Sequence, residues 1–226
     1  MNKPQLQNKP WVLLGGGGHA SVVLALLREL RCEVLCVSDP ALLAKSVFEW
    51  QGLPVCDDAT VLAQHLPSTV FLANGVGFVQ TPEPRQDVFN TYAEDGYMFP
   101  ALVHPFSWVA PDVLLDEGVQ IMAGAVVQPG THLGANTLVN TGARIDHGCQ
   151  IGPHSHVACG AILCGNVHLG SHTFIGAGAV VIQGMSLGNH CTVGAGSVVL
   201  QSQSSHHRLV GTPARSIPNS PTGTTP

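Results

Sequence analysis

Charged residues are scarce in this sequence, and basic residues are the scarcest of them. Only 10% of the 226 residues are Asp, Glu, Lys or Arg, and the nine Lys and Arg form no cluster. Proteins that bind nucleic acid or anionic membranes carry basic patches that neutralise phosphate groups. The net charge of −5 therefore argues against both kinds of partner.

Long apolar runs and paired cysteines are also missing. No stretch approaches the roughly 20 apolar residues that a membrane-spanning helix needs. The N-terminal stretch MNKPQLQNKP lacks the apolar segment of a signal peptide. The seven cysteines are odd in number and scattered, without a CxxC pair. This usage predicts reduced thiols and a cytoplasmic protein.

The first hundred residues alternate between two kinds of pattern. Short apolar runs typical of buried strands are separated by segments with helical periodicity. Such alternation predicts a small parallel α/β sheet. The runs lie at 11–15, 33–39, 69–75 and 97–103, and the helical patterns lie at 19–31, 59–66 and 84–95. At the other end of the chain, residues 218–226 are predicted to form a disordered tail.

From about residue 103 onward, an aliphatic residue recurs at every sixth position without a miss. A small residue stands two positions before most of them. Because six is even, the aliphatic residue and its small partner face the same way in extended chain. A fixed six-residue period is typical of a parallel β-helix, in which stacked coils satisfy one another's backbone amides. The series is Val103, Val109, Leu115, Ile121, Val127, Leu133, Val139, Ile145, Ile151, Val157, Leu163, Leu169, Ile175, Val181, Leu187, Val193 and Val199.

Six motifs together resemble the sugar acetyltransferases of the NeuD/PglD type. They are LLGGGGHA (13–20), ANGVG (73–77), LVHPFSWV (102–109), VNTGARIDHGCQIGPHSHVACGA (139–161), CGNVHLG (164–170) and LVGTPARSI (209–217). The resemblance implies a Rossmann-like nucleotide-sugar-binding domain over 1–100. It also implies a left-handed β-helix acyltransferase domain over 101–217, with three sides in each 18-residue coil.

The same resemblance implies a reaction and an assembly. The expected reaction is N-acetylation of a nucleotide-linked amino sugar by acetyl-CoA, without a metal and without a covalent enzyme intermediate. A UDP-4-amino-4,6-dideoxy sugar is the first candidate acceptor. The expected assembly is a homotrimer in which coenzyme A lies between adjacent copies.

His147 is the candidate general base. Asp146 precedes it. Gly165 lies 18 residues later, which is one coil further along, so the His147 imidazole would face a glycine amide. That pairing suits a base beside an oxyanion donor. The resemblance implies the same roles, with Asp146 orienting the imidazole, although family members usually carry Glu at that position. His156 and Asn140 are expected near the thioester, and Arg215 near a coenzyme A phosphate.

The glycine-rich stretch is the candidate nucleotide-sugar site. It follows a strand and opens a helix, where backbone amides and the helix N-terminus favour a phosphate. The resemblance assigns Gly17, Gly18 and His19 to this pocket. Asp39 is expected to meet ribose or base, and Asn74 and Gly75 complete the pocket at the carboxyl edge of the sheet.

Three other functions remain open on the sequence. An O-acetyltransferase acting on sialic acid or a related sugar would use the same residues. A γ-carbonic-anhydrase-like enzyme would need three convergent histidines, whereas His154, His172 and His190 are predicted to form a straight surface column about 4.8 Å apart. Such a column does not match the tetrahedral geometry of zinc. A non-catalytic nucleotide-sugar-binding scaffold would make His147 dispensable.

Overall fold

The computed structural model describes residues 6–78 and 83–217, so the tail predicted for 218–226 lies outside the described residues. The chain divides into two compact units, one ending at Pro105 and the other beginning at Phe106. Each unit is described by itself. Within the described residues, no helix has both the length and the apolar character needed to cross a membrane.

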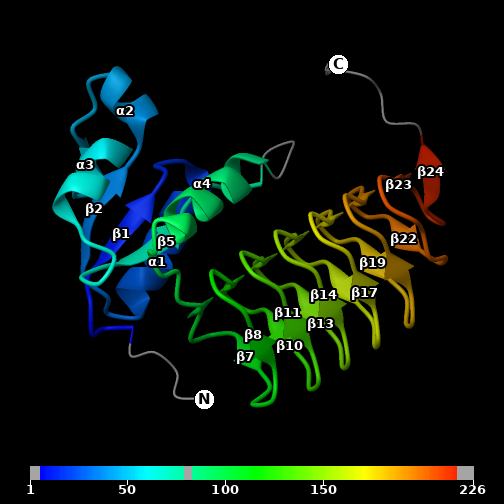
Figure 1. Ribbon diagram of the computed structural model, residues 1–226. Coiled ribbons are helices and arrows are strands. Elements are labelled where there is room, and N and C mark those ends of the chain that lie inside the picture. The colour runs from blue at the N-terminus through cyan, green and yellow to red at the C-terminus, as the bar shows by residue number, and fades with distance from the viewer. Residues whose placement is uncertain (1–5, 79–82, 218–226) are drawn as a thin grey trace. The chain divides into compact units, whose positions relative to one another are not determined.

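The first unit contains a five-stranded sheet in the order β3-β4-β2-β1-β5 (Figure 1). Four of its strands run parallel, and β3 pairs antiparallel to β4 at one edge. This arrangement confirms the predicted parallel α/β sheet. The strands are β1 (Trp11–Leu14), β2 (Val34–Ser38), β3 (Glu49–Trp50), β4 (Leu53–Cys56) and β5 (Phe71–Asn74).

Four helices accompany the sheet. Helix α1 (Gly18–Glu29) packs on β1 and β5, and its residues Val23, Leu26 and Leu27 are buried. Asp57 starts a shorter helix by accepting a hydrogen bond from the Thr60 amide at 2.8 Å, which is a typical N-cap. The helices are α1 (Gly18–Glu29), α2 (Pro40–Ala44), α3 (Asp58–Gln64) and α4 (Glu83–Glu94).

The strand expected at 97–103 is wrong for most of its length. Only β6 (Leu102–Val103) is a strand, and Pro100 lies just before it. Proline lacks the N–H that a strand interior needs, which explains the interruption. The short elements α2, β3 and β4 were not predicted, because runs of two to five residues carry too little periodicity.

The second unit is a β-helix with three sheets, whose strands are two residues long except for β23 and β24, which have three residues (Figure 1). The first sheet holds β7 (Trp108–Val109), β10 (Val126–Val127), β13 (Arg144–Ile145), β16 (Ile162–Leu163), β19 (Val180–Val181) and β22 (Val198–Val199). The second holds β8 (Leu114–Leu115), β11 (His132–Leu133), β14 (Gln150–Ile151), β17 (His168–Leu169) and β20 (Ser186–Leu187). The third holds β9 (Gln120–Ile121), β12 (Leu138–Val139), β15 (His156–Val157), β18 (Phe174–Ile175), β21 (Thr192–Val193), β23 (Arg208–Val210) and β24 (Arg215–Ile217).

The aliphatic series forms the core of this β-helix. Partner strands are offset by 18 residues, as in the pairing of Val127 with Ile145 and of Ile145 with Leu163. Every aliphatic residue of the series from Ile121 to Val199 is buried, and so are the small residues two positions earlier, such as Ala125. The 18-residue coil and the inward phase are therefore confirmed.

Most corners of the β-helix turn through a residue with positive φ. From Gly118 to Gly196 this residue recurs at every sixth position, and it is glycine at most of them. Only glycine adopts that conformation without a steric cost, although Asn, Asp and His tolerate it better than other residues. The non-glycine corner residues in this series are Asn136, His154, Asn166, His172 and His190.

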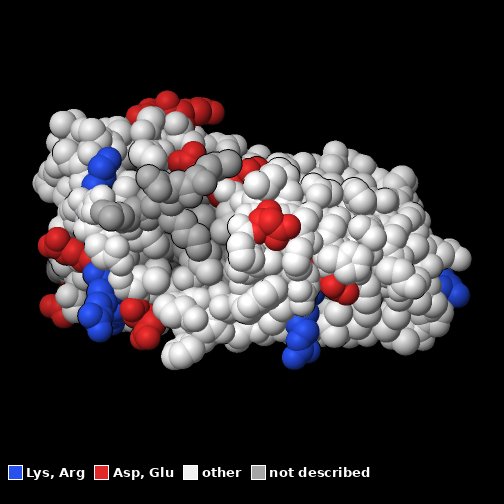
Figure 2. Space-filling view, turned by 90° about the horizontal axis from the view of Figure 1, so that it is seen from below, with Lys and Arg blue, Asp and Glu red and all other residues white. Residues whose placement is uncertain are grey.

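Charged side chains remain sparse on the folded protein. Figure 2 shows a face on which Lys and Arg lie apart from one another, with no basic patch. Among the described residues only one ion pair is found, between His132 and Asp116. Packing and the stacked backbone hydrogen bonds, rather than charge pairs, thus hold the coils together.

Candidate functional site

The structure brings His147 and Gly165 together on successive coils. His147 lies in the corner between β13 and β14, and Gly165 lies in the corner between β16 and β17, directly above it in the stack. The Asn166 amide donates a hydrogen bond to the His147 carbonyl at 2.8 Å, which fixes one corner on the other. The His147 side chain is exposed, whereas Gly165 is buried.

The imidazole occupies the space that a side chain at residue 165 would need. A Cβ atom placed on Gly165 would lie 2.6 Å from Nε2 and 2.7 Å from Cε1 of His147. These separations are far shorter than a van der Waals contact. Alanine stands at the same hexapeptide position in other corners, as at Ala135 and Ala177, so the backbone itself accepts a Cβ there. The imidazole is therefore the reason that residue 165 must be glycine.

The Gly165 amide is available to a ligand. Among residues 6–78 and 83–217, no acceptor for its N–H is found, while its carbonyl accepts from the Gly184 amide at 2.9 Å. A buried backbone N–H normally has a partner. Here a donor without an acceptor in the described part of the chain lies beside an imidazole, which is the combination expected of a base and an oxyanion donor.

The Asp146 carboxylate makes a different contact from the one expected. Its Oδ1 accepts a hydrogen bond from the His147 backbone amide at 2.7 Å. Within the described part of the chain it makes no hydrogen bond to the imidazole. Asp146 thus holds the corner backbone from which the His147 side chain projects, and it positions the ring through the main chain.

Asn140 and His156 form a second pair at a different corner. Nδ2 of Asn140 lies 3.2 Å from Nε2 of His156, and Oδ1 of Asn140 accepts from the Thr141 amide at 2.7 Å. The His156 ring is buried and packs edge-on against Phe174, with centroids 5.2 Å apart. Asn140 lies between β12 and β13, one corner before His147 along the chain. Asn140 and His147 thus lie at successive corners of the same coil.

Arg215 lies on the exposed face of β24. Its Nη1 donates to the Ala214 carbonyl at 3.1 Å, and its strand pairs antiparallel with β23. The side chain is exposed and makes no ion pair within the described residues. Such a cation can meet a phosphate without first breaking a salt bridge.

In the first unit, the glycine-rich loop leaves open space at two positions. Gly17 caps helix α1 and Gly18 begins it, and a Cβ added to either would meet no atom within 4 Å. Both glycines are exposed, and the half-buried His19 follows them. The N-terminus of α1 therefore presents backbone amides and the positive end of a helix dipole, which together suit a phosphate.

Asp39 serves the fold at this edge of the sheet. Its Oδ2 accepts from the Gly16 amide at 2.7 Å, and its Oδ1 accepts from the Ala41 and Leu42 amides as the N-cap of α2. Both oxygens therefore order the loop backbone. In the structure Asp39 holds the glycine loop in place, and its contact with a ribose or base stays a prediction.

Asn74 and Gly75 also lie at the carboxyl edge of the sheet, and both are buried. Nδ2 of Asn74 donates to the Arg85 carbonyl at 2.8 Å, and Arg85 Nη1 donates back to the Asn74 carbonyl. A Cβ on Gly75 would meet Ala20 at 2.8 Å, so glycine allows α1 to approach the sheet. Arg85 was not singled out in the sequence, and burial lowers the pKa of its guanidinium to about 9.

The predicted histidine column is present and extends further than expected. Rings of His154 and His172 stack with centroids 5.1 Å apart, those of His172 and His190 at 4.5 Å, and those of His190 and His206 at 4.9 Å. Nowhere in the described residues do three His, Cys, Asp or Glu side chains converge as metal ligands.

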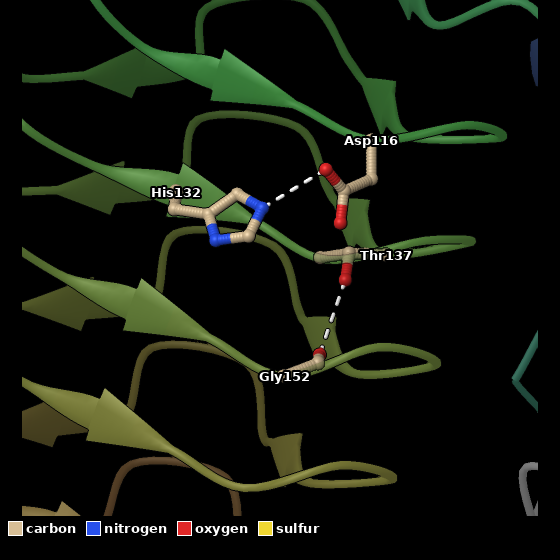
Figure 3. A network of polar contacts seen from close by, with 4 residues as sticks. All are labelled: Asp116, His132, Thr137 and Gly152. Atoms are coloured by element: carbon tan, nitrogen blue, oxygen red, sulfur yellow. Dashed lines mark hydrogen bonds and ion pairs between the residues drawn. The ribbon is translucent and has the colours of Figure 1, made fainter.

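A shallow groove of about 370 Å³ lies on the second sheet of the β-helix. His132, Gln150 and His168 line it from β11, β14 and β17. Figure 3 shows Asp116 pointing at His132, whose Nε2 lies 2.9 Å from the carboxylate. The two residues are 16 positions apart in sequence, so their contact could be predicted only from the 18-residue length of a coil.

Comparisons with known proteins agree with this architecture. A family model described as a hexapeptide repeat of succinyl-transferase matches residues 166–201. The acetyltransferase domain of PglB from Neisseria gonorrhoeae, in complex with acetyl coenzyme A, is 30% identical with a TM-score of 0.86, and the match covers 93% of this chain and 100% of that one. A comparison with curated protein sequences finds no match.

Two further solved structures extend the comparison. A histidine-to-alanine variant of GDP-perosamine N-acetyl transferase from Caulobacter crescentus, in complex with CoA and GDP-perosamine, is 31% identical with a TM-score of 0.86. That match covers 94% of this chain and 98% of the other. WeeI from Acinetobacter baumannii is 19% identical over 93% of this chain and 100% of its own, with a TM-score of 0.62, and shares the fold.

The fold and the matches define an acyltransferase that joins a Rossmann-like domain to a left-handed parallel β-helix, as the sequence predicted. More particularly, the chain belongs to the hexapeptide-repeat sugar acetyltransferases of the NeuD/PglD type, which use acetyl-CoA.

Proposed function

We propose that this protein transfers the acetyl group of acetyl-CoA to the amino group of a nucleotide-linked amino sugar in the cytoplasm. The observation that carries the proposal is the His147 imidazole lying against Gly165, whose buried N–H has no acceptor among the described residues. The similar PglB domain binds acetyl coenzyme A, and the similar Caulobacter crescentus enzyme binds CoA and GDP-perosamine. Those ligands support the proposed pair of substrates.

The proposed chemistry is a direct transfer. The lone pair of the sugar amine attacks the thioester carbonyl carbon, while a ring nitrogen of His147 removes a proton from the amine. The Gly165 N–H stabilises the negative charge that develops on the carbonyl oxygen. The carbon–sulfur bond then breaks, the amide is formed, and coenzyme A leaves as the thiol after its sulfur takes the proton that His147 had removed. Asp146 acts as a positioning residue through the His147 amide.

The proposed acceptor site is the open N-terminus of α1. Gly17 and Gly18 let a diphosphate approach the backbone, and His19 lies beside it. Asp39, Asn74 and Gly75 support this site by holding the loop and the strand ends around it. The first acceptor to test is a UDP-4-amino-4,6-dideoxy sugar, with GDP-perosamine as its guanine counterpart.

A homotrimer completes the proposed site. Within one copy, His147 and Gly165 lie at corresponding corners of successive coils, and Asn140 lies at the corner before His147, beside His156 of β15. Neighbouring copies packed side by side would bring one copy's first pair toward another copy's second pair, with coenzyme A between them. Arg215 would then be placed to meet a phosphate of the coenzyme.

The test is a screen for release of the coenzyme A thiol from acetyl-CoA in the presence of different acceptors. We expect release with a nucleotide-linked 4-amino sugar, and an acetamide in the product by mass spectrometry. The 4-hydroxy counterpart of the same sugar nucleotide is the matched control and should give background. Release with free sialic acid but with none of the amino sugars would overturn the proposal in favour of O-acetylation.

A further inference from the structure

Two cysteines of the first unit lie in contact although they are 20 residues apart. Cys36 is in β2 and Cys56 ends β4, and the Cys56 thiol donates to the Cys36 sulfur at 3.4 Å. Strands β2 and β4 pair Ser38 with Cys56, and Cys36 lies two residues before Ser38 in β2. Both sulfurs therefore lie on the same face of the two adjacent strands. All seven cysteines of the chain are free thiols.

The surroundings of this pair distinguish it from the other cysteines. Nε2 of His65 lies 4.0 Å from the Cys36 sulfur, and the Cys56 sulfur lies 3.6 Å from the Val37 carbonyl. Cys36 is only 6% exposed, whereas Cys56 is partly exposed. A small oxidant can therefore reach the pair, while a bulky one cannot reach the Cys36 sulfur.

The hydrogen bond between the sulfurs also separates their acidities. It lowers the pKa of Cys36, against the opposing effect of burial. It raises the pKa of Cys56, and burial and the negative charges of Asp57 and Asp58 act in the same direction. Cys36 is thus the sulfur with the greater thiolate character, and the thiolate is the form that reacts with oxidants.

We propose that Cys36 and Cys56 form a reversible redox site that takes hydrogen peroxide or a similarly small hydroperoxide as its oxidant. The Cys36 thiolate attacks one peroxide oxygen, the O–O bond breaks, and hydroxide leaves, giving a sulfenic acid. The Cys56 thiol then attacks the Cys36 sulfur and forms the disulfide, while the sulfenic hydroxyl leaves as water with the Cys56 proton. Overall, two thiols and one peroxide yield one disulfide and two waters. Two thiols, such as dithiothreitol, reverse the oxidation.

Two hydrogen bonds through Asp39 connect this cysteine pair to the glycine-rich loop. The Cys56 carbonyl accepts from the Asp39 amide at 3.0 Å, and the Asp39 carboxylate accepts from the Gly16 amide at 2.7 Å. Disulfide formation shortens the sulfur separation to about 2.05 Å. We expect the ends of β2 and β4 to shift as the bond forms, and Asp39 to shift with them. We expect oxidation to weaken binding of the sugar nucleotide rather than of acetyl-CoA, and this expectation rests on the proposed function.

The test treats the reduced full-length protein with stoichiometric hydrogen peroxide and then maps its alkylated peptides. We expect a peptide linking Cys36 to Cys56, a mass loss of two hydrogen atoms, and full reversal by dithiothreitol. The variant Cys56→Ser should stop at a Cys36 sulfenic acid, which is seen as a gain of one oxygen atom in the mass of the peptide that contains Cys36. The exposed Cys159 provides the matched control, because Cys159→Ser should still form the same link.

Several results would overturn this inference. One is a peptide map in which Cys159 is oxidised while Cys36 and Cys56 both remain alkylated. Another is stoichiometric zinc binding that blocks alkylation of the pair, which would make it a metal site. The peptide map does not depend on turnover, so it separates a failure of the redox site from a failure of the proposed function. Where turnover is measured, the expected effect of oxidation is a several-fold rise in KM for the sugar nucleotide with KM for acetyl-CoA unchanged.

Discussion

The β-helix and the N-terminal sheet differ most in how far their geometry repeats. In the β-helix, one six-residue pattern sets the inward aliphatic residue, its small partner and the corner residue with positive φ. This pattern holds at every corner from Gly118 to Gly196. In the sheet, no two connections are alike, and the short α2 and β3 interrupt the alternation. Because the repeat predicts which residue type each position needs, a residue that departs from the repeat indicates a local reason for its presence.

Glycine shows this contrast most clearly. At Gly178 the pattern requires glycine for its positive φ of 66°, while at Gly165 the pattern does not require it and a neighbouring imidazole does. At Gly18 in the first unit, neither backbone conformation nor a neighbour requires glycine, and the space around it is open. The same residue type thus serves the fold, the catalytic geometry and the proposed ligand in turn.

The largest effect on stability is expected in the inward phase of the repeat. Leu133→Ala removes a fully buried side chain and leaves a cavity between coils, so we expect a loss of about 2–5 kcal/mol in the free energy of unfolding. Leu200→Ala is the matched control, because Leu200 is exposed and its loss should cost less than about 0.5 kcal/mol. Urea unfolding measures both, and equal effects would contradict the assignment of the core.

The next effect falls on activity rather than stability. Gly165→Ala places a Cβ where the His147 imidazole lies, so the ring must move, and we expect a fall of roughly 10²-fold in kcat. Ala135 and Ala177 show that the corner accepts alanine, so the melting temperature should hardly change. Steady-state kinetics and thermal unfolding measure the two quantities on one sample. A stable variant with unchanged kcat would show that the imidazole position is immaterial.

The smallest effects test the two other uses of glycine, and their signs are opposite. Gly178→Ala forces a Cβ into the left-handed region and should cost about 1–2 kcal/mol. Gly18→Ala adds a helix-forming residue in open space and should gain about 0.4–1 kcal/mol. Thermal unfolding gives both values. Effects of the same sign would remove the distinction drawn between the two units.

The sequence predicted the repeating half of the molecule better than the other half. A six-residue period fixes the inward phase, and the family-derived coil of 18 residues then places Gly165 above His147. The strand expected at 97–103 was wrong because Pro100 interrupts it, and α2, β3 and β4 are too short to leave a periodic signal. Local patterns therefore suffice where the fold repeats and fail where tertiary packing selects short elements.

Side-chain roles were harder to predict than positions. The Asp146 carboxylate bonds the backbone amide next to it rather than the imidazole, because its side chain is short. Asp39 ties down the glycine loop, a contact across 23 residues that no local pattern reveals. The Cys36–Cys56 contact depends on the register of β2 and β4, and the sequence showed only that the cysteines were scattered.

The most direct measurement is the rate of coenzyme A release by His147→Ala with a nucleotide-linked 4-amino sugar. The matched control is His190→Asn, which also removes an exposed imidazole and keeps a residue that tolerates the corner, as Asn136 and Asn166 do. We expect kcat to fall by about 10²–10⁴-fold in His147→Ala and to stay unchanged in His190→Asn. Equal rates in His147→Ala and the unmodified protein would contradict the claim that this imidazole accepts the proton.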